Sequence, residues 1–260
     1  MKKINISRKN LSIPYMIYMV CFVVAPLAVL LFYSFTDSDG KITFHNFINF
    51  FTDGNTLGTL LYSVVVALIT TLVCLIIAYP VAFILAKGHI KNKTILLMIF
   101  IMPMWINFTL RITALKEILT FFEKNLAYFP FVNTIIGMTY DFLPFMILPI
   151  YTVLINIDDC YMEAGLDLGA DKVQAFMKII LPMSKAGIIS GVTMVFLPAM
   201  TNYVILDMLY NSTYIMGSLI GSYFSAYDWH NGSMISIILL TIIIIVTVLS
   251  TDSNHKEERL

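Results

Sequence analysis

The sequence predicts an all-α integral membrane protein whose chain crosses the bilayer six times. Hydrophobic residues make up 59% of the 260 residues and charged residues only 12%, and the mean hydropathy is +0.85. A soluble domain is about half apolar and about a quarter charged. In addition, six separate apolar stretches reach the roughly 20 residues that a membrane-spanning helix needs. These observations exclude an ordinary soluble protein.

The six predicted spans follow the apolar stretches in order. They are Ile13–Phe35, Leu60–Ala86, Thr94–Leu115, Phe131–Ile155, Ala186–Leu206 and Ser233–Ser250. The first follows a basic segment, MKKINISRKN, as the core of a signal peptide would. Its apolar run is longer than such a core and lacks a small-residue cleavage site, so we expect a retained span.

The distribution of Lys and Arg predicts the orientation. Basic residues gather in the N-terminal segment, in the connection between spans two and three, in residues 158–185 and in the tail. The connections on the opposite side, between spans one and two, three and four, and five and six, hold only Lys41, Lys116 and Lys124, besides Arg111 near the end of the third span. Because basic loops stay on the cytoplasmic side, we expect a multi-pass membrane protein with both ends of the chain in the cytoplasm. Residues 1–12, the loop 158–185 and the tail 251–260 would be cytoplasmic, and residues 13–250 would form the six-span domain.

Two glycines near the start of the fifth span predict close helix packing. Gly187 and Gly191 are four residues apart and therefore lie on one face of a helix, where small residues let two backbones approach.

Residues 158–185, DDCYMEAGLDLGADKVQAFMKIILPMSK, form a polar segment between the fourth and fifth spans. We expect two short helices separated by a bend. Asp159 can cap the first helix, and Gly169 suits a left-handed conformation at its end. Asp171 and Gln174 have the spacing of a capping box that opens the second helix, and Pro182 limits or kinks the helix after it. The alternative is that these residues form an ordinary amphipathic loop without a special role.

The motifs of catalysis are missing from the sequence. It contains no G-x-x-x-x-G-K-[ST] phosphate loop, no nucleophile elbow, no H-E-x-x-H zinc motif and no Gly-rich dinucleotide motif. We therefore expect that this chain does not hydrolyse ATP itself and is not an enzyme, which for a membrane protein favours a role in transport.

The pattern within the polar segment resembles the cytoplasmic "EAA" loop of ABC importer permeases. The matching residues are Glu163, Ala164, Gly165, Gly169, Ile179, Leu181 and Pro182. The resemblance implies the type I ABC importer permease fold, a location in the bacterial cytoplasmic (inner) membrane, and a loop that inserts into a cleft of an ATPase subunit. Glu163 would be the charged anchor, Ala164 and Gly165 would allow close approach, and Gly169 would make the bend. Gly165 replaces the second alanine that is usual in the family, a change that weakens helix propensity by up to about 1 kcal/mol.

Three further segments narrow the resemblance to the spermidine/putrescine importer permeases of the PotB type. They are PMWINFTLRITALKEIL (103–119), YDFLPFMILPIYTVL (140–154) and VTMVFLPAMTNYVILDML (192–209). The resemblance implies four kinds of contact: ABC ATPase subunits, a second similar permease, an extracytoplasmic polyamine-binding protein and membrane lipid. ATP and Mg would be bound by the ATPase, with no cofactor in this chain, and no nucleic acid is expected to bind.

A polyamine is a flexible polycation, so its path should offer carboxylates and aromatic faces. Asp141 is the acid nearest the membrane interior. A pathway role, pairing with a polar side chain of a neighbouring helix, or simple exposure to a water-filled vestibule would account for it. Asp207 and Tyr203, near the outer end of the fifth span, could receive the cation, or Asp207 could simply be solvated. Trp105 and Asn107 are further candidates, although Trp105 could instead pack between helices. Arg111 would repel the substrate from a pore, and we expect it to reach the interface or to pair with an acid.

Two alternatives to a polyamine importer remain from the sequence. One is an ABC permease of the same type that serves another small solute. The other is a secondary transporter that needs no ATPase, which would leave the polar segment 158–185 unexplained.

Overall fold

The structure is a computed structural model that describes residues 13–37, 39–88, 91–209 and 215–257, with side chains described up to Val248. Within these ranges the regular secondary structure is helical, apart from an isolated β-bridge between Thr36 and Ile42. The predicted all-α class is therefore confirmed. The predicted cytoplasmic segment 1–12 and the last three residues of the predicted tail lie outside the described residues.

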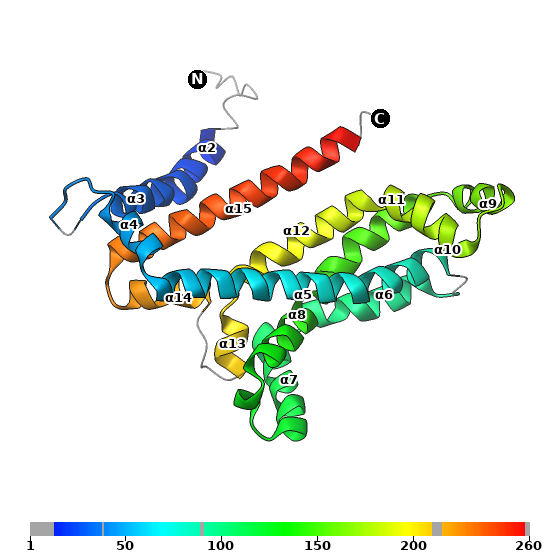
Figure 1. Ribbon diagram of the computed structural model, residues 1–260, viewed down its shortest axis with the longest axis horizontal. Coiled ribbons are helices and arrows are strands. Elements are labelled where there is room, and N and C mark those ends of the chain that lie inside the picture. The colour runs from blue at the N-terminus through cyan, green and yellow to red at the C-terminus, as the bar shows by residue number, and fades with distance from the viewer. Residues whose placement is uncertain (1–12, 38, 89–90, 210–214, 258–260) are drawn as a thin grey trace, which may run out of the picture. The chain divides into compact units, whose positions relative to one another are not determined.

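The first of two compact units consists of Met1–Leu57 and Leu219–Ile242. Its helical segments, drawn in blue and orange in Figure 1, are α2 (Ile13–Met19), η1 (Val20–Val24), α3 (Ala25–Ser34), α4 (His45–Thr52), most of α14 (Met216–Ser225) and the first half of α15 (Trp229–Glu257). The side chain of Asn46 in α4 donates to the carbonyls of Ser34 and Thr36. These bonds occupy carbonyls that the end of α3 leaves without helical partners.

The second unit consists of Gly58–Ser218 and Ile243–Leu260. Its helical segments are α5 (Gly54–Lys87, which begins in the first unit), α6 (Lys93–Ile101), η2 (Met102–Trp105), α7 (Phe108–Glu123), η3 (Leu126–Tyr128), α8 (Pro130–Asn156), α9 (Cys160–Asp167), α10 (Lys172–Ala175), η4 (Phe176–Ile180), α11 (Leu181–Met183), α12 (Lys185–Thr201), α13 (Val204–Leu209) and the second half of α15.

Four helices of the described chain are long and apolar enough to cross a membrane. They are Ile13–Ser34, Gly54–Lys87, Pro130–Asn156 and Trp229–Val248, and they correspond to the first, second, fourth and sixth predicted spans. Two bent helix pairs raise the number to as many as six if each pair is one span. The last helix continues to Glu257, beyond the predicted boundary at Ser250.

The third predicted span, Thr94–Leu115, is not one straight helix. Lys93–Trp105 and Phe108–Glu123 meet at an angle of 99°. Ile106 is extended, and the side chain of Asn107 accepts hydrogen bonds from the backbone N–H groups of Thr109 and Leu110. An Asn in this position starts a new helix and does not continue the old one, which the apolar composition of the stretch concealed.

The fifth predicted span, Ala186–Leu206, is also interrupted. Helix α12 ends at Thr201, and α13 begins at Val204. At its other end α12 is bent by 64° from the segment Lys172–Met183 of the polar loop. The predicted span therefore contains α12, a break at Asn202 and Tyr203 after Pro198, and the first residues of α13, so it is not one continuous helix.

Small residues bring the central helices of the second unit together. Helices α8 and α12 run side by side (Figure 1), and a Cβ atom built on Gly187 would lie 3.0 Å from the carbonyl oxygen of Pro149. One built on Gly191 would lie 2.6 Å from the sulfur of Met146. The close packing predicted from these two glycines is confirmed. In a lipid environment such packing replaces the hydrophobic effect as the force between helices.

Helix α5 follows the same rule along one face. Its fully buried positions include small residues at helical spacing, namely Ala67, Thr70, Cys74, Ala78 and Ala82. The thiol of Cys74 lies 3.9 Å from the carbonyl oxygen of Thr139, so this face meets α8. Large aliphatic side chains such as Leu72 and Ile76 are exposed on the opposite face, as expected of a helix surrounded by lipid.

Candidate functional site

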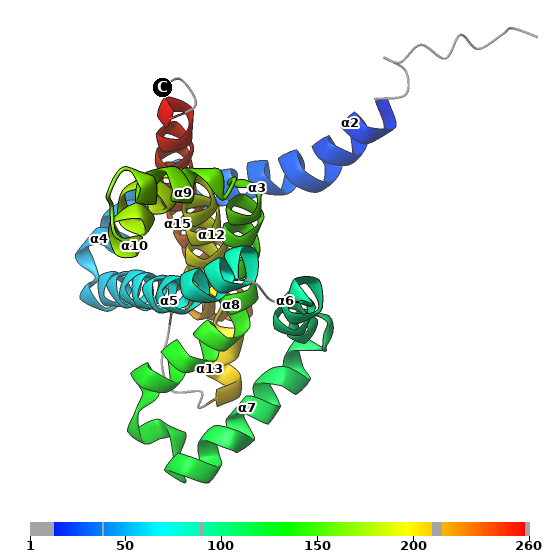
Figure 2. The ribbon, with the colours of Figure 1, turned by 90° about the vertical axis from the view of Figure 1, so that its right-hand side faces the viewer.

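The polar loop 158–185 folds as two short helical segments joined by a tight bend, with α9 before the bend and α10, η4 and α11 after it (Figure 2). The bend lies at Gly169, whose φ of +88° is the left-handed conformation predicted for it. After the bend, the carboxylate of Asp171 accepts a hydrogen bond of 2.7 Å from the backbone N–H of Gln174. The predicted cap of the second helix is therefore confirmed.

The cap of the first helix differs from the prediction. Asp159 occupies the cap position but makes no side-chain capping bond. Instead, Asp158 Oδ1 accepts from the backbone N–H of Cys160 at 3.0 Å. This bond holds the pKa of Asp158 below its usual range, and the nearby Lys87 ammonium adds to the shift. Asp159 is drawn away because its own carboxylate lies 2.7 Å from Lys87 Nζ, a partner that only the folded chain supplies.

Gly165 packs the two halves of the loop against each other. It is buried, and a Cβ atom at this position would lie 2.5 Å from Ile179 Cδ1 and 3.5 Å from Ala175 Cβ. The glycine thus has a packing reason, since the methyl group of an alanine would require Ile179 to move. The lower helix propensity of Gly165, expected from the sequence, is thus offset by the close contact that only a glycine allows here.

The other predicted loop residues divide into exposed and half-buried positions. Glu163, Ala164, Gly169 and Pro182 are exposed, whereas Ile179 and Leu181 are half-buried. Sequence reasoning missed the exposed apolar side chains of the loop, of which the most exposed are Leu168 (89% exposed), Val173 (70%) and Met177 (53%). Their presence in an otherwise polar loop was the available signal. Exposed apolar groups beside an exposed carboxylate suit a protein partner better than water.

A cavity of about 430 Å³ lies between the end of α5 and the loop. Its lining combines apolar side chains with two acids and two lysines: Phe83, Ile84, Lys87, Gly88, Asp159, Met162, Glu163, Lys172 and Ile180. The predicted anchor Glu163 therefore stands at the edge of a depression in the protein surface.

A buried ion pair joins α7 to α8. Arg111 Nη2 lies 2.6 Å from Asp141 Oδ1, and the side chains are only 7% and 8% exposed. Arg111 Nε and Nη1 have no hydrogen-bond partner among the described residues. Of the three interpretations open from the sequence, the structure shows the pairing of Asp141 with a polar side chain of a neighbouring helix. For Arg111 it shows one of the two expected outcomes, an acidic partner.

The remaining pathway candidates lie at exposed positions. Asp207 is on the exposed face of α13, whose opposite face packs Ile205 and Leu209 over Gly137 of α8. Tyr203 is at the break before α13 and is 37% exposed. Trp105 is 81% exposed, so the alternative of an aromatic packed between helices of this chain is not what the structure has. Asn107 is exposed and caps α7.

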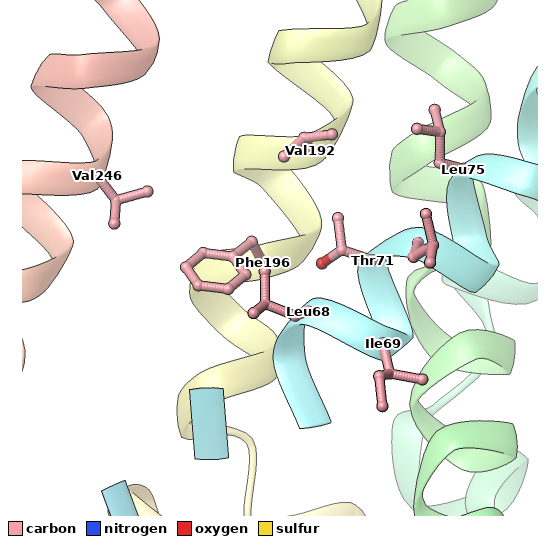
Figure 3. A pocket seen from close by; sticks show the side chains of 8 residues that line it. Leu68, Ile69, Thr71, Leu75, Val192, Phe196 and Val246 are labelled. Atoms are coloured by element: carbon pink, nitrogen blue, oxygen red, sulfur yellow. The ribbon is translucent and has the colours of Figure 1, made fainter. Parts of the chain in front are cut away.

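An apolar cavity of about 550 Å³ lies in the second unit. Figure 3 shows Val192 and Phe196 of α12 beside Leu68 and Thr71 of α5, with Val246 of α15 across from them. The hydroxyl of Thr71 is already bonded to the carbonyl of Ala67 at 2.7 Å. The lining offers no carboxylate, so it cannot stabilise a polycation. Among the described residues there is also no cluster of three His, Cys, Asp or Glu side chains that could hold a metal ion.

A family model decides what kind of protein has this geometry. The model for the binding-protein-dependent transport system inner membrane component matches residues 78–255. The chain belongs to this family. The protein is therefore a membrane permease component. The matched range contains the whole polar loop and both bent helix pairs.

Relatives in two bacteria are spermidine/putrescine transport system permease proteins PotB. The protein of Haemophilus influenzae is 34% identical over 260 aligned residues, which cover 88% of each chain. The protein of Escherichia coli K12 is 37% identical over 196 residues, covering 69% of this chain and 71% of its own.

Solved structures of ABC importers have the same fold. A chain of a bacterial ABC transporter involved in the import of the acidic polysaccharide alginate superposes with a TM-score of 0.72 at 14% identity, covering 97% of this chain and 95% of its own. A chain of the alginate transporter in complex with a periplasmic protein bound to an alginate pentasaccharide gives 0.74 at 13% identity, with coverage of 97% and 94%. The fold of this family member is therefore that of an ABC importer permease.

Proposed function

We propose that this chain is the permease subunit of an ATP-driven importer of spermidine and putrescine. The observation that supports the substrate most directly is the 34% identity with a spermidine/putrescine permease over 88% of both chains. The alginate transporters share the fold at much lower identity, so they bear on the architecture and not on the substrate.

In this proposal the bent pair Lys93–Trp105 and Phe108–Glu123 forms the third span, and α12 with the start of α13 forms the fifth, which makes six spans in all. The N- and C-terminal segments and the loop 158–185 face the cytoplasm, in agreement with the excess of Lys and Arg on that side. The loop docks on the ATPase through Glu163, with Leu168, Val173 and Met177 as apolar contacts. The exposure of all four side chains supports this role.

The complex would contain a second permease similar to this one, ATPase subunits that bind ATP and Mg, and an extracytoplasmic polyamine-binding protein. The periplasmic protein bound to one of the alginate transporters supports this last kind of partner.

Asp207 and Tyr203 are the candidates best placed to receive the cation, because both are exposed near the proposed outer end of the fifth span, at and after the break between α12 and α13. Trp105 and Asn107 are proposed as further pathway residues. Asp141 would join the pathway only if a substrate ammonium competes with Arg111 for its carboxylate, since the two side chains already form a buried ion pair.

Reconstitution in proteoliposomes tests the function. The complete complex, with its binding protein, should take up labelled spermidine only when ATP is supplied. Glu163→Lys should lose ATP-driven uptake or release the ATPase, because it reverses the charge at the docking point. The matched control Glu117→Lys makes the same change at an exposed position of α7, on the proposed outer side, and should retain both properties.

Three outcomes would contradict the proposal. Preference of the wild-type complex for a solute that is not a polyamine would favour a permease of the same type for another substrate. Uptake by this chain alone, driven by an ion gradient, would favour a secondary transporter. Normal ATPase recovery and uptake in Glu163→Lys would remove Glu163 from the docking surface.

A further inference from the structure

We propose that Lys87 is a positioning residue that aligns the polar loop 158–185 with the transport helices, and that the efficiency of ATP coupling depends on it. This inference rests on the proposed function, since it concerns how movement of the loop reaches the spans. Lys87 is the last residue of α5. It is far in sequence from the loop and belongs to none of the motifs of the sequence.

The Lys87 ammonium joins three chain segments at one point. It donates to the carbonyl oxygen of Ile157, the C-cap residue that follows α8, and it lies 2.7 Å from Oδ1 of Asp159, the residue that precedes α9. A cation at the end of α5 and α8 is favoured by the negative ends of both helix dipoles. The same cation partners an acid at the start of α9. The C-terminal ends of α5 and α8 and the N-terminal end of α9 therefore share one charged group.

The two bonds of Lys87 differ in strength. The Lys87 side chain is only 15% exposed, whereas that of Asp159 is 71% exposed. The ion pair with Asp159 is therefore screened by water and salt. The bond to the Ile157 carbonyl joins a sheltered ammonium to the C-terminal end of α8, where the last carbonyls of a helix have no i+4 partners within it. We expect this second bond to account for most of the effect of Lys87.

Aromatic packing attaches the loop to α5 independently of Lys87. The ring of Phe176 meets Tyr79 and Phe83 edge to face, with ring centroids 5.7 Å and 5.1 Å apart. The hydroxyl of Tyr79 also lies 2.7 Å from that of Ser184. Tyr79, Phe83 and Lys87 are spaced by four residues, so they form one face of the helix.

The separate roles of the aromatic contacts and of Lys87 predict a specific defect in a variant that lacks Lys87. The aromatic contacts hold the loop on α5, but Phe176 and Ser184 both lie after the bend at Gly169, so these contacts do not set the angle at which α9 leaves α8. Without Lys87 the loop would remain attached and could still bind the ATPase. Its movement would be transmitted less effectively to α5 and α8.

The test uses the complete reconstituted complex and measures spermidine uptake per ATP hydrolysed. Lys87→Met keeps the length of the apolar stem and removes the charge. We expect it to assemble with the ATPase and to lower uptake per ATP about tenfold, the size expected for a lost hydrogen bond to a charged group. Lys87→Arg should recover most of the coupling, because a guanidinium can still donate to both oxygens. Lys91→Met, at an exposed lysine of the same connection, is the matched control and should couple normally.

A second variant separates the two bonds. Asp159→Asn leaves the bond to Ile157 intact and should reduce coupling only about two- to threefold, as an exposed ion pair predicts. Equal uptake per ATP in Lys87→Met and wild type would overturn the inference, and so would an equal loss in Lys91→Met. Failure of Lys87→Met to assemble would overturn it as well, because Lys87 would then hold the loop and not align it. If the wild-type complex itself shows no ATP-dependent uptake, the proposed function is wrong and the inference falls with it.

Discussion

Neutralising Asp141 should destabilise the protein much more than removing both members of its ion pair. The carboxylate lies 2.6 Å from Arg111 Nη2, and both side chains are less than a tenth exposed. In Asp141→Asn the guanidinium stays buried without a counter-charge, and two of its nitrogens already lack partners among the described residues. Breaking one side of a buried pair costs about 3–5 kcal/mol, roughly two to four orders of magnitude in the folding equilibrium.

Replacing both residues together removes this penalty. Arg111→Met with Asp141→Leu leaves apolar side chains between α7 and α8, and such exchanges are often neutral or stabilising. We therefore expect the double variant to be within about 1 kcal/mol of the wild type, with a coupling energy well above the roughly 0.5 kcal/mol of independent sites. Asp207→Asn, a charge loss at an exposed position, should change stability by less than about 0.5 kcal/mol.

The assay is the thermal unfolding midpoint of the purified protein in detergent, measured beside spermidine uptake of the reconstituted complex. The reasoning is refuted if Asp141→Asn melts with the wild type, or if the double variant is no more stable than the single one. Uptake then distinguishes the two roles of Asp141. A stable double variant that transports makes the pair structural, whereas a stable double variant that does not transport assigns one of the two residues to the pathway.

Three further predictions concern the helix contacts, the loop and the outer surface. Gly187→Ala should lower the thermal unfolding midpoint, because its Cβ atom would lie 3.0 Å from a backbone oxygen. In the control Gly58→Ala the Cβ atom would have nothing within 4 Å, so this variant should raise stability by up to about 1 kcal/mol. Equal midpoints of the two variants would contradict the packing argument. Asp158→Ala should speed amide exchange at the start of α9. Because the pKa of Asp158 is lowered on folding, the protection of these amides in the wild type should be complete above the pKa of the unfolded state and should disappear as the pH falls through the pKa of the folded state. Exchange that depends neither on pH nor on the substitution, after correction for its intrinsic rate, would exclude the cap. Asp207→Asn should reduce polyamine uptake without loss of assembly, and Glu117→Gln, at another exposed acid, should not; equal uptake in both would remove Asp207 from the pathway.

Features that depend on neighbouring residues were predictable. The left-handed bend at Gly169 and the cap at Asp171 follow from residue types a few positions apart. The packing glycines Gly187 and Gly191 were visible because four residues make one helical turn. In each case the physical cause lies within a single helix or turn.

The errors have a common origin in competition between local signals and contacts. Apolar composition indicated a continuous third span, but Asn107 bonds its own following N–H groups and starts a new helix. Asp159 had the right position for a cap, yet Lys87 takes its carboxylate and Asp158 makes the capping bond. The exchange could not be foreseen, because Lys87 is brought to the loop only when α5 and α8 pack together.

The sequence by itself determined that this chain is a helical membrane protein with a polar loop of the ABC permease type. Composition, charge distribution and capping are properties of short segments, and they keep their meaning in any arrangement of the helices. Only the tertiary structure decided which charges meet. Arg111 finds Asp141 thirty residues away, and Lys87 finds Ile157 seventy residues away. In a medium with few water molecules a charge must find its partner within the protein, so the packing of the helices determines which acids remain free for a substrate.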